Sequence, residues 1–149
     1  MKKILIISAN YYMKISSEMS RETINTLDNS KSLDGKKKNF KYEIINVPGV
    51  FEIPVIISKN IKKYDGFIAL GCVIKGETPH FEYISKATFN ALMYLAIQNK
   101  KPIGNGIITA LKKSQVLKRC GISNLSKSKG KGFEAAMAVI EVFKNVSKS

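Results

Sequence analysis

Four short apolar runs alternate with helical patterns along the chain. The runs cover residues 4–7, 42–47, 67–74 and 103–108. The central runs are almost continuously apolar, as strands buried on both faces of a parallel sheet are. The sequence therefore predicts four strands at these positions.

Between the runs, apolar residues recur every three or four positions, which is the spacing of one helix face. Helices are expected around 19–27, 51–63, 84–95 and 112–120, and Gly121 would stop the fourth. Thr78 suits the N-cap of the third helix and Pro79 its first position. The last helix starts near Lys131 and has one apolar side, made of Phe133, Ala136, Met137, Ile140 and Phe143. Polar loops are expected at 30–39, where Asp34-Gly35 signals a turn, and in the Ser/Lys/Gly-rich stretch after Gly121.

Strands that alternate with helices indicate an α/β fold. We predict a three-layer sandwich with a four-stranded parallel sheet and helices on both faces (flavodoxin-like), in a single domain over residues 1–149. Ligands of such sheets lie beyond the C-terminal ends of the strands. That rule selects the segments 8–12, 48–52, 72–80 and 104–109.

The chain is strongly basic, with 25 Lys and Arg against 11 Asp and Glu and a net charge of +14. Such a charge permits nucleic-acid binding, but no nucleic-acid motif is present and the basic residues lack interleaved aromatics. No apolar run approaches the roughly 20 residues of a membrane span. The N-terminal apolar run is too short for a secretion signal, so we expect a cytoplasmic protein. Cys72 and Cys120 are too few for a disulfide framework or a zinc site, and Cys72 is expected to be a small core residue.

The most informative segment is Gly76-Glu77-Thr78-Pro79-His80, which joins a predicted buried strand to a long helix. A strand, a glycine and a helix start together expose main-chain N–H groups that can hold an anion. His80 is the only histidine, and histidine is the side chain whose ordinary pKa lies near neutrality. An isolated histidine is often a capping or core residue, but this position favours catalysis on a phosphorylated substrate.

The other strand ends carry candidate binding residues. Tyr11 would either pack or stack on a flat heterocycle. Glu52 would either complement a helix dipole or accept hydrogen bonds from hydroxyl groups, with main-chain groups of Val50 and Phe51 nearby. Asn105 stands between two glycines, which we interpret as allowing a ligand to approach closely.

Two cations further along the chain are candidates for binding phosphate. Arg119 can bind a phosphate through two parallel hydrogen bonds, and Lys131 can add a second charge. Most of the other basic residues are expected to form a solvated face.

Three motifs resemble the lumazine synthase family, and the similarity spans nearly the whole chain. They are VPGVFEIP at 47–54, LGCVIKGETPHFEY at 70–83 and KGFEAA at 131–136. The middle motif is specific, whereas the first and last would be weak alone.

The resemblance implies a condensation of 5-amino-6-(D-ribitylamino)uracil with 3,4-dihydroxy-2-butanone 4-phosphate in riboflavin biosynthesis, without a metal or redox cofactor. It implies His80 as the proton-transfer residue. It implies phosphate contacts from Gly76, Glu77, Thr78 and Arg119. It implies a pocket for the uracil ring and ribityl chain formed by Tyr11, Val50, Phe51, Glu52, Cys72, Val73, Ile74, Asn105 and Lys131.

The resemblance also implies a homopentamer whose active sites lie between neighbouring chains. Tyr11, Glu52 and His80 would come from one chain, and Asn105, Arg119 and Lys131 from the next. Some members form a hollow sixty-chain shell. We expect a free pentamer instead, because the chain starts directly at its first strand and the stretch between Gly121 and Lys131 is longer than usual by about four residues.

Three alternatives remain at this point. A flavin- or nucleotide-binding module on the same fold would bind without turnover and would leave His80 and Arg119 without a task. A nucleic-acid-binding protein would explain the charge. A relative with the same fold and a changed substrate would keep the site but reject the two reactants.

Overall fold

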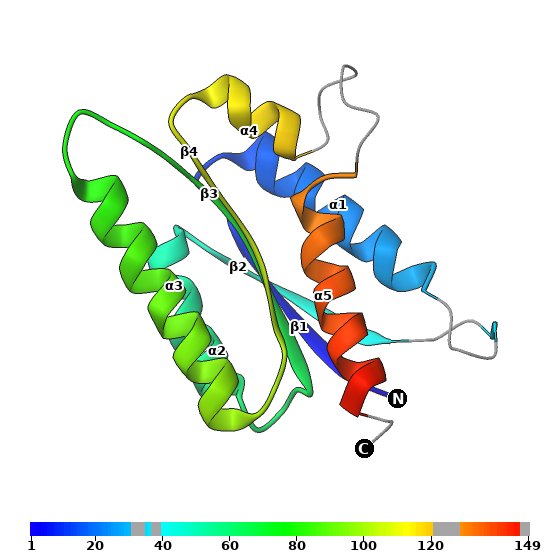
Figure 1. Cartoon of the computed structure of the whole chain (residues 1–149). Coiled ribbons are helices and arrows are strands. Elements are labelled where there is room, and N and C mark those ends of the chain that lie inside the picture. Colours follow the sequence, from blue (N-terminus) through cyan, green and yellow to red (C-terminus); the bar gives the residue numbers. More distant parts are fainter. Residues whose placement is uncertain (31–34, 37–39, 121–128, 147–149) are drawn as a thin grey trace.

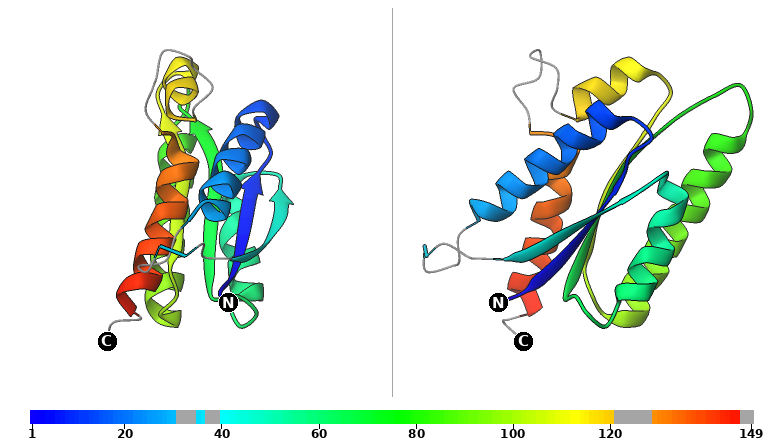
Figure 2. Two further views of the ribbon diagram at one scale, coloured as in Figure 1. Left: turned by 90° about the vertical axis from the view of Figure 1, so that its right-hand side faces the viewer. Right: turned by 180° about the vertical axis from the view of Figure 1, so that it is seen from behind.

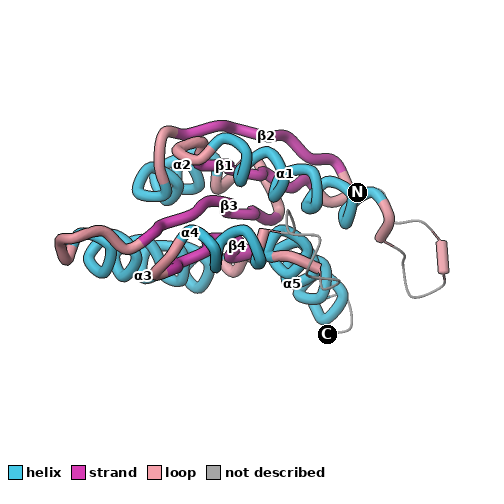
Figure 3. The backbone as a smooth tube through the Cα atoms, turned by 90° about the horizontal axis from the view of Figure 1, so that it is seen from above, coloured by secondary structure: helices cyan, strands magenta, loops and turns pink. Residues whose placement is uncertain are grey.

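The four predicted strands form one parallel sheet in the order β2-β1-β3-β4 (Figure 1, Figure 3). The computed structural model describes residues 1–30, 35–36, 40–120 and 129–146. Its strands are β1 (Lys3–Ala9), β2 (Lys41–Val47), β3 (Gly66–Ile74) and β4 (Ile103–Ala110). Each is longer than its predicted apolar run by one to three residues.

Helices cover both faces of this sheet (Figure 1, Figure 2). The helices α1 (Met13–Asp28), α4 (Lys113–Arg119) and α5 (Lys131–Val146) lie on one face. The helices α2 (Ile53–Asn60) and α3 (His80–Asn99) lie on the other. The predicted three-layer α/β architecture is therefore confirmed.

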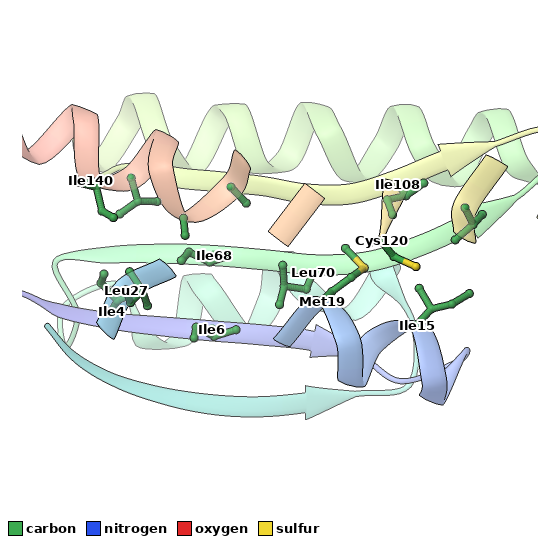
Figure 4. Close-up of a cluster of buried hydrophobic side chains, with 14 of the residues drawn as sticks. Ile4, Ile6, Ile15, Met19, Leu27, Ile68, Leu70, Ile108, Cys120 and Ile140 are labelled. Atoms are coloured by element: carbon green, nitrogen blue, oxygen red, sulfur yellow. The ribbon is translucent and has the colours of Figure 1, made fainter. Parts of the chain in front are cut away.

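The alternation of side chains along β1 explains why both faces are covered. Ile4 and Ile6 join the core under α1 and α5, which Figure 4 shows, whereas Leu5 and Ile7 join the core under α2 and α3. All four are fully buried. Because an inner strand is buried on both faces, its sequence is continuously apolar. The edge strand β2 is mostly exposed, and its sequence is correspondingly more polar.

Two glycines of β4 let neighbouring elements approach its backbone closely. A β-carbon added at Gly104 would lie 2.3 Å from the carbonyl oxygen of Ala135 in α5. One added at Gly106 would lie 2.6 Å from Leu70 and 2.8 Å from the carbonyl oxygen of Ala69. The expectation that these glycines admit a ligand is therefore wrong, because they admit a helix and a neighbouring strand.

Two predicted helices differ in detail. The third begins at His80 with Pro79 at the N-cap, so Thr78 is not the cap and Pro79 is not the first helical residue. The first turn forms when the N–H groups of Glu82 and Tyr83 donate to the carbonyl of Pro79. The expected helix at 51–63 is a 3₁₀ turn, η1 (Val50–Glu52), followed by α2, which ends at Asn60.

The two expected polar loops fall largely outside the described residues, as does the longer stretch after Gly121. Gly35 has a φ of 79°, which suits the glycine of a turn. Within the described ranges, every helix is too short or too polar to cross a membrane.

Candidate active site

Three of the four predicted segments lie at one edge of the sheet. In a parallel sheet all C-terminal strand ends share an edge, which is the upper end of the molecule in Figure 1. The loops after β1, β2 and β3 therefore lie together there. The N–H of Asn10 donates to the carbonyl of Val47 at 2.9 Å, which joins the ends of β1 and β2.

Two consecutive tyrosines after β1 have different environments. Tyr12 is half-buried against the core, and burial raises the pKa of its phenol. Tyr11 is 76% exposed and touches Tyr12 edge to face, with ring centroids 4.9 Å apart and planes at 78°. Tyr12 thus anchors the loop and leaves a face of the Tyr11 ring free to stack on a flat ligand.

The turn after β2 is anchored by one buried residue. Val50 is buried and packs on Gly71, where an added β-carbon would lie 2.5 Å from a Val50 methyl group. Phe51 is 61% exposed, and the side chain of Glu52 is exposed with a carboxylate oxygen beside Gly49. Val50 therefore holds the turn in place, while Phe51 and Glu52 present their side chains to solvent at the sheet edge.

The loop from β3 to α3 is open on its outer side. Gly76, Glu77, Thr78 and His80 are all exposed, and a β-carbon added at Gly76 would meet no atom within 4 Å. Among the described residues, no main-chain carbonyl accepts from the N–H groups of residues 76–78. Because these donors lie ahead of a helix N-terminus, the loop is suited to an anion.

Two cations lie at the ends of α4 and α5. The guanidinium Nη1 of Arg119 donates to the carbonyl oxygen of Thr109 at 2.9 Å, which holds the side chain along the C-terminal end of β4. The ammonium of Lys131 is 3.3 Å from a carboxylate oxygen of Glu134, one turn further along α5. The three-residue spacing of Lys131 and Glu134 is enough to predict their ion pair on a helix. No sequence pattern predicts the hydrogen bond from Arg119 to the carbonyl of Thr109.

Asn105 does not lie at the C-terminal edge of the sheet, where the rule for strand ends predicted it. It pairs with Ala69 in the lower half of β4, five residues before the strand ends at Ala110. At 3.3 Å per residue it lies about 17 Å below the C-terminal edge. It is exposed, and its side-chain oxygen accepts from the N–H of Ile107 at 3.0 Å. A single chain therefore does not bring Asn105 to the loops that carry Tyr11 and His80.

The chain matches known proteins over almost its whole length. The sequence profile of the 6,7-dimethyl-8-ribityllumazine synthase family covers residues 1–147. The chain belongs to this family. A synthase of this name from Bartonella tribocorum is 37% identical over 144 residues, which cover 95% of this chain and 89% of that protein. Those of Bartonella henselae and Corynebacterium kroppenstedtii are 40% and 35% identical, covering 91% and 83% of this chain and 83% and 77% of their own lengths.

Membership of the lumazine synthase family identifies the chain as an enzyme, a transferase of riboflavin biosynthesis. It favours catalysis over a module that binds flavin or nucleic acid without turnover. Within the described ranges, no three His, Cys, Asp or Glu side chains come close enough together to hold a metal ion.

Cys72 lies beside the candidate site, near the end of β3. It is half-buried rather than fully in the core, because β3 emerges from under the helices at its last three residues. Burial, and to a lesser extent Cys120, raises the pKa of the Cys72 thiol from 9.0 to about 11. At neutral pH the chain therefore keeps Cys72 as a neutral thiol, which is a poor nucleophile.

The raised pKa of Cys72 has a consequence for stability. Between about pH 9 and pH 11 the folded chain keeps a proton that the unfolded chain releases, so this contribution to the free energy of unfolding is present below pH 9 and is lost as the pH rises toward 11. Urea unfolding at pH 8 and pH 10.5 should show a smaller loss for Cys72→Ala than for the unsubstituted chain. Equal losses in the two proteins would contradict the assignment.

Proposed function

We propose that this chain joins 5-amino-6-(D-ribitylamino)uracil to 3,4-dihydroxy-2-butanone 4-phosphate. The amine forms an imine with the ketone, inorganic phosphate leaves, and ring closure gives 6,7-dimethyl-8-ribityllumazine with the loss of two waters in total. The observation that carries this proposal is the open, histidine-bearing loop at the C-terminal sheet edge of a chain from this family.

The phosphate of the butanone would lie on the loop at 76–78. Its oxygens would accept from the main-chain N–H groups of Gly76, Glu77 and Thr78, and Arg119 would neutralise the charge that develops as phosphate leaves. His80, at the end of the same loop, would move protons during imine formation and elimination. Holding two reactants in line supplies most of the acceleration, with proton transfer as an aid.

The ribitylaminouracil would lie across the ends of β1 and β2. The exposed ring of Tyr11 would stack on the uracil. Glu52 would accept hydrogen bonds from the ribityl hydroxyls, beside main-chain groups of Val50 and Phe51. The half-buried end of β3 would form the wall, through Cys72, Val73 and Ile74.

A second copy of the chain would complete the site. Asn105 is the exposed residue of the edge strand β4, too far from the C-terminal edge to serve the loops of its own chain. Asn105, Arg119 and Lys131 would instead face the loops of the neighbour. The helix α3 supports such a contact, since Tyr83, Met93, Tyr94 and Ile97 are between 62 and 72% exposed. Large apolar side chains exposed along one helix are typical of a protein interface.

The proposed contact is head to tail, and contacts of this kind form a ring when the rotation between neighbours closes. We expect a homopentamer of five 16.6 kDa chains, about 83 kDa in total. Multi-angle light scattering at micromolar concentration measures this mass directly. A megadalton particle would show that the pentamers assemble into a shell.

Mixing the two purified substrates with the enzyme tests the proposed reaction. Lumazine formation, followed by its absorbance, should depend on both substrates and release one phosphate per product. Flavin or substrate binding without turnover would support the non-catalytic module instead. A salt-dependent gel shift at physiological ionic strength, without turnover, would support a nucleic-acid-binding protein.

A further inference from the structure

We propose that Glu22 in α1 is a positioning residue that fixes Arg119 and Lys131 relative to each other. This inference rests on the proposed role of those two cations in phosphate binding. Arg119 ends α4 and Lys131 begins α5, twelve positions later in the sequence. A covalent connection of that length does not by itself set the spacing of its ends, so noncovalent contacts must do so.

The carboxylate of Glu22 binds the start of α5 on both sides of Lys131. Its Oε1 accepts from the N–H of Gly130 at 2.6 Å and from the N–H of Phe133 at 3.1 Å. Both N–H groups lie at a helix N-terminus, where the helix itself offers them no acceptor. The helix dipole also favours a negative charge there. Charge-assisted bonds of this kind are stronger than neutral ones, so Glu22 sets the position from which the Lys131 side chain extends.

The end of α4 packs against the same glycine that Glu22 binds. A β-carbon added at Gly130 would lie 2.7 Å from the carbonyl oxygen of Arg119 and 2.8 Å from Oε2 of Glu22. The backbone of Gly130 is therefore packed between the Arg119 main chain and the Glu22 side chain. Glu22 thus holds Gly130 directly, and Gly130 in turn packs on the main chain of Arg119.

A neighbouring residue on α1 strengthens this junction. The hydroxyl of Thr23 is fully buried, 2.8 Å from the carbonyl of Met19 and 3.3 Å from the carbonyl of Gly132. A β-carbon at Gly132 would lie 2.5 Å from the carbonyl oxygen of Met19, so α1 and α5 are in direct backbone contact. Figure 2 shows the two helices side by side. By contrast Glu18, one turn earlier, pairs with Arg21 on its own helix.

Replacing Glu22 distinguishes a positioning role from a purely electrostatic one, because the two roles change the affinity for phosphate in opposite directions. If Glu22 acted only through its charge, removing it would leave the cations less neutralised and phosphate would bind more tightly. If it positions the cations, Glu22→Ala should raise KM for the butanone phosphate roughly ten-fold, because a shift of about 1 Å in a binding group has effects of this size or larger. KM for the ribitylaminouracil should change by less than about two-fold.

The experiment compares Glu22→Ala, Glu22→Gln and Glu18→Ala in the assembled enzyme. Glu22→Gln keeps an oxygen acceptor, so its KM should lie between those of Glu22→Ala and the unsubstituted enzyme. Glu18→Ala, the matched control, should leave both KM values unchanged. Titration with inorganic phosphate gives a second reading that needs no turnover, and Glu22→Ala should weaken its binding by a similar factor.

Each result bears on one of the two proposals. An unsubstituted enzyme that makes no lumazine refutes the proposed reaction, and the phosphate titration still tests Glu22. Active enzyme with unchanged or tighter phosphate binding in Glu22→Ala overturns the positioning role alone. Should Glu22→Ala fail to assemble, an unchanged KM and an unchanged phosphate affinity in Glu22→Gln would overturn it.

Discussion

Replacing Arg119 by alanine should lower kcat/KM for the butanone phosphate by about 100- to 1000-fold, the usual cost of losing a donor that stabilises developing charge. The bond to the carbonyl of Thr109 holds this guanidinium at the end of β4, so no ordering is needed when substrate binds. A fixed, planar cation suits a departing phosphate, whose oxygens it meets in pairs. Steady-state kinetics with each substrate varied in turn measure the effect.

The neighbouring residue provides a matched control for this prediction. Lys118 is an exposed cation on the same short helix, so Lys118→Ala removes one positive charge and no proposed contact. It should change kcat/KM by less than about three-fold, the scale of a screened surface charge. Arg119→Lys should fall between the two, because an ammonium keeps the charge and loses the paired geometry. Equal losses in Lys118→Ala and Arg119→Ala would show that only net charge matters.

The second large effect is expected at His80. Replacing it by alanine should lower kcat by about 100-fold, near the lower end of the range for general acid–base catalysis. A residual rate is expected because, in the proposed site, the loop, Arg119 and Tyr11 would still hold the two reactants together. His80 is exposed at the first position of α3, so its loss leaves no cavity and the fold should be unaffected.

Chemical rescue separates proton transfer from a structural role at this position. Imidazole added to His80→Ala should restore part of the rate, whereas His80→Asn, which keeps a hydrogen-bonding group but neither gains nor loses a proton near neutral pH, should remain slow. A complete loss of turnover in an intact assembly would mean that His80 does more than transfer protons. An unchanged rate would remove it from the mechanism.

The layers of the fold could be predicted from the sequence because consecutive residues of each strand show whether helices cover that strand. Strands β1 and β3 are apolar at most of the positions that helices cover, with Ser8 as a buried polar exception, and that pattern can be counted directly from residues such as Ile4 to Ile7. The sequence predicted helix starts less well, since a proline such as Pro79 suits both the N-cap and the position after it. The glycines around Asn105 were misinterpreted because a glycine says only that something comes close, and not what it is.

Residues of the candidate site could be predicted where each directly follows the end of a single strand. Tyr11, Glu52 and His80 each follow a recognisable strand, and the topology alone brings their loops to one edge. The contacts of Glu22 with Gly130 and of Arg119 with Thr109 connect elements whose mutual placement is decided by packing. No periodicity in the sequence reports such contacts, so only the three-dimensional structure reveals them.

The bare backbone contact between α5 and β4 makes a single stiff block out of two parts of the proposed site. Asn105 lies on the strand of that block, and Lys131 lies at the start of its helix. Gly104 has no side chain to separate the strand from the helix. Asn105 and Lys131 would therefore keep their relative position if the proposed site moved. The turn ahead of α3, where a β-carbon at Gly76 would meet no atom within 4 Å, is the part with room to adjust to a reactant of changing shape.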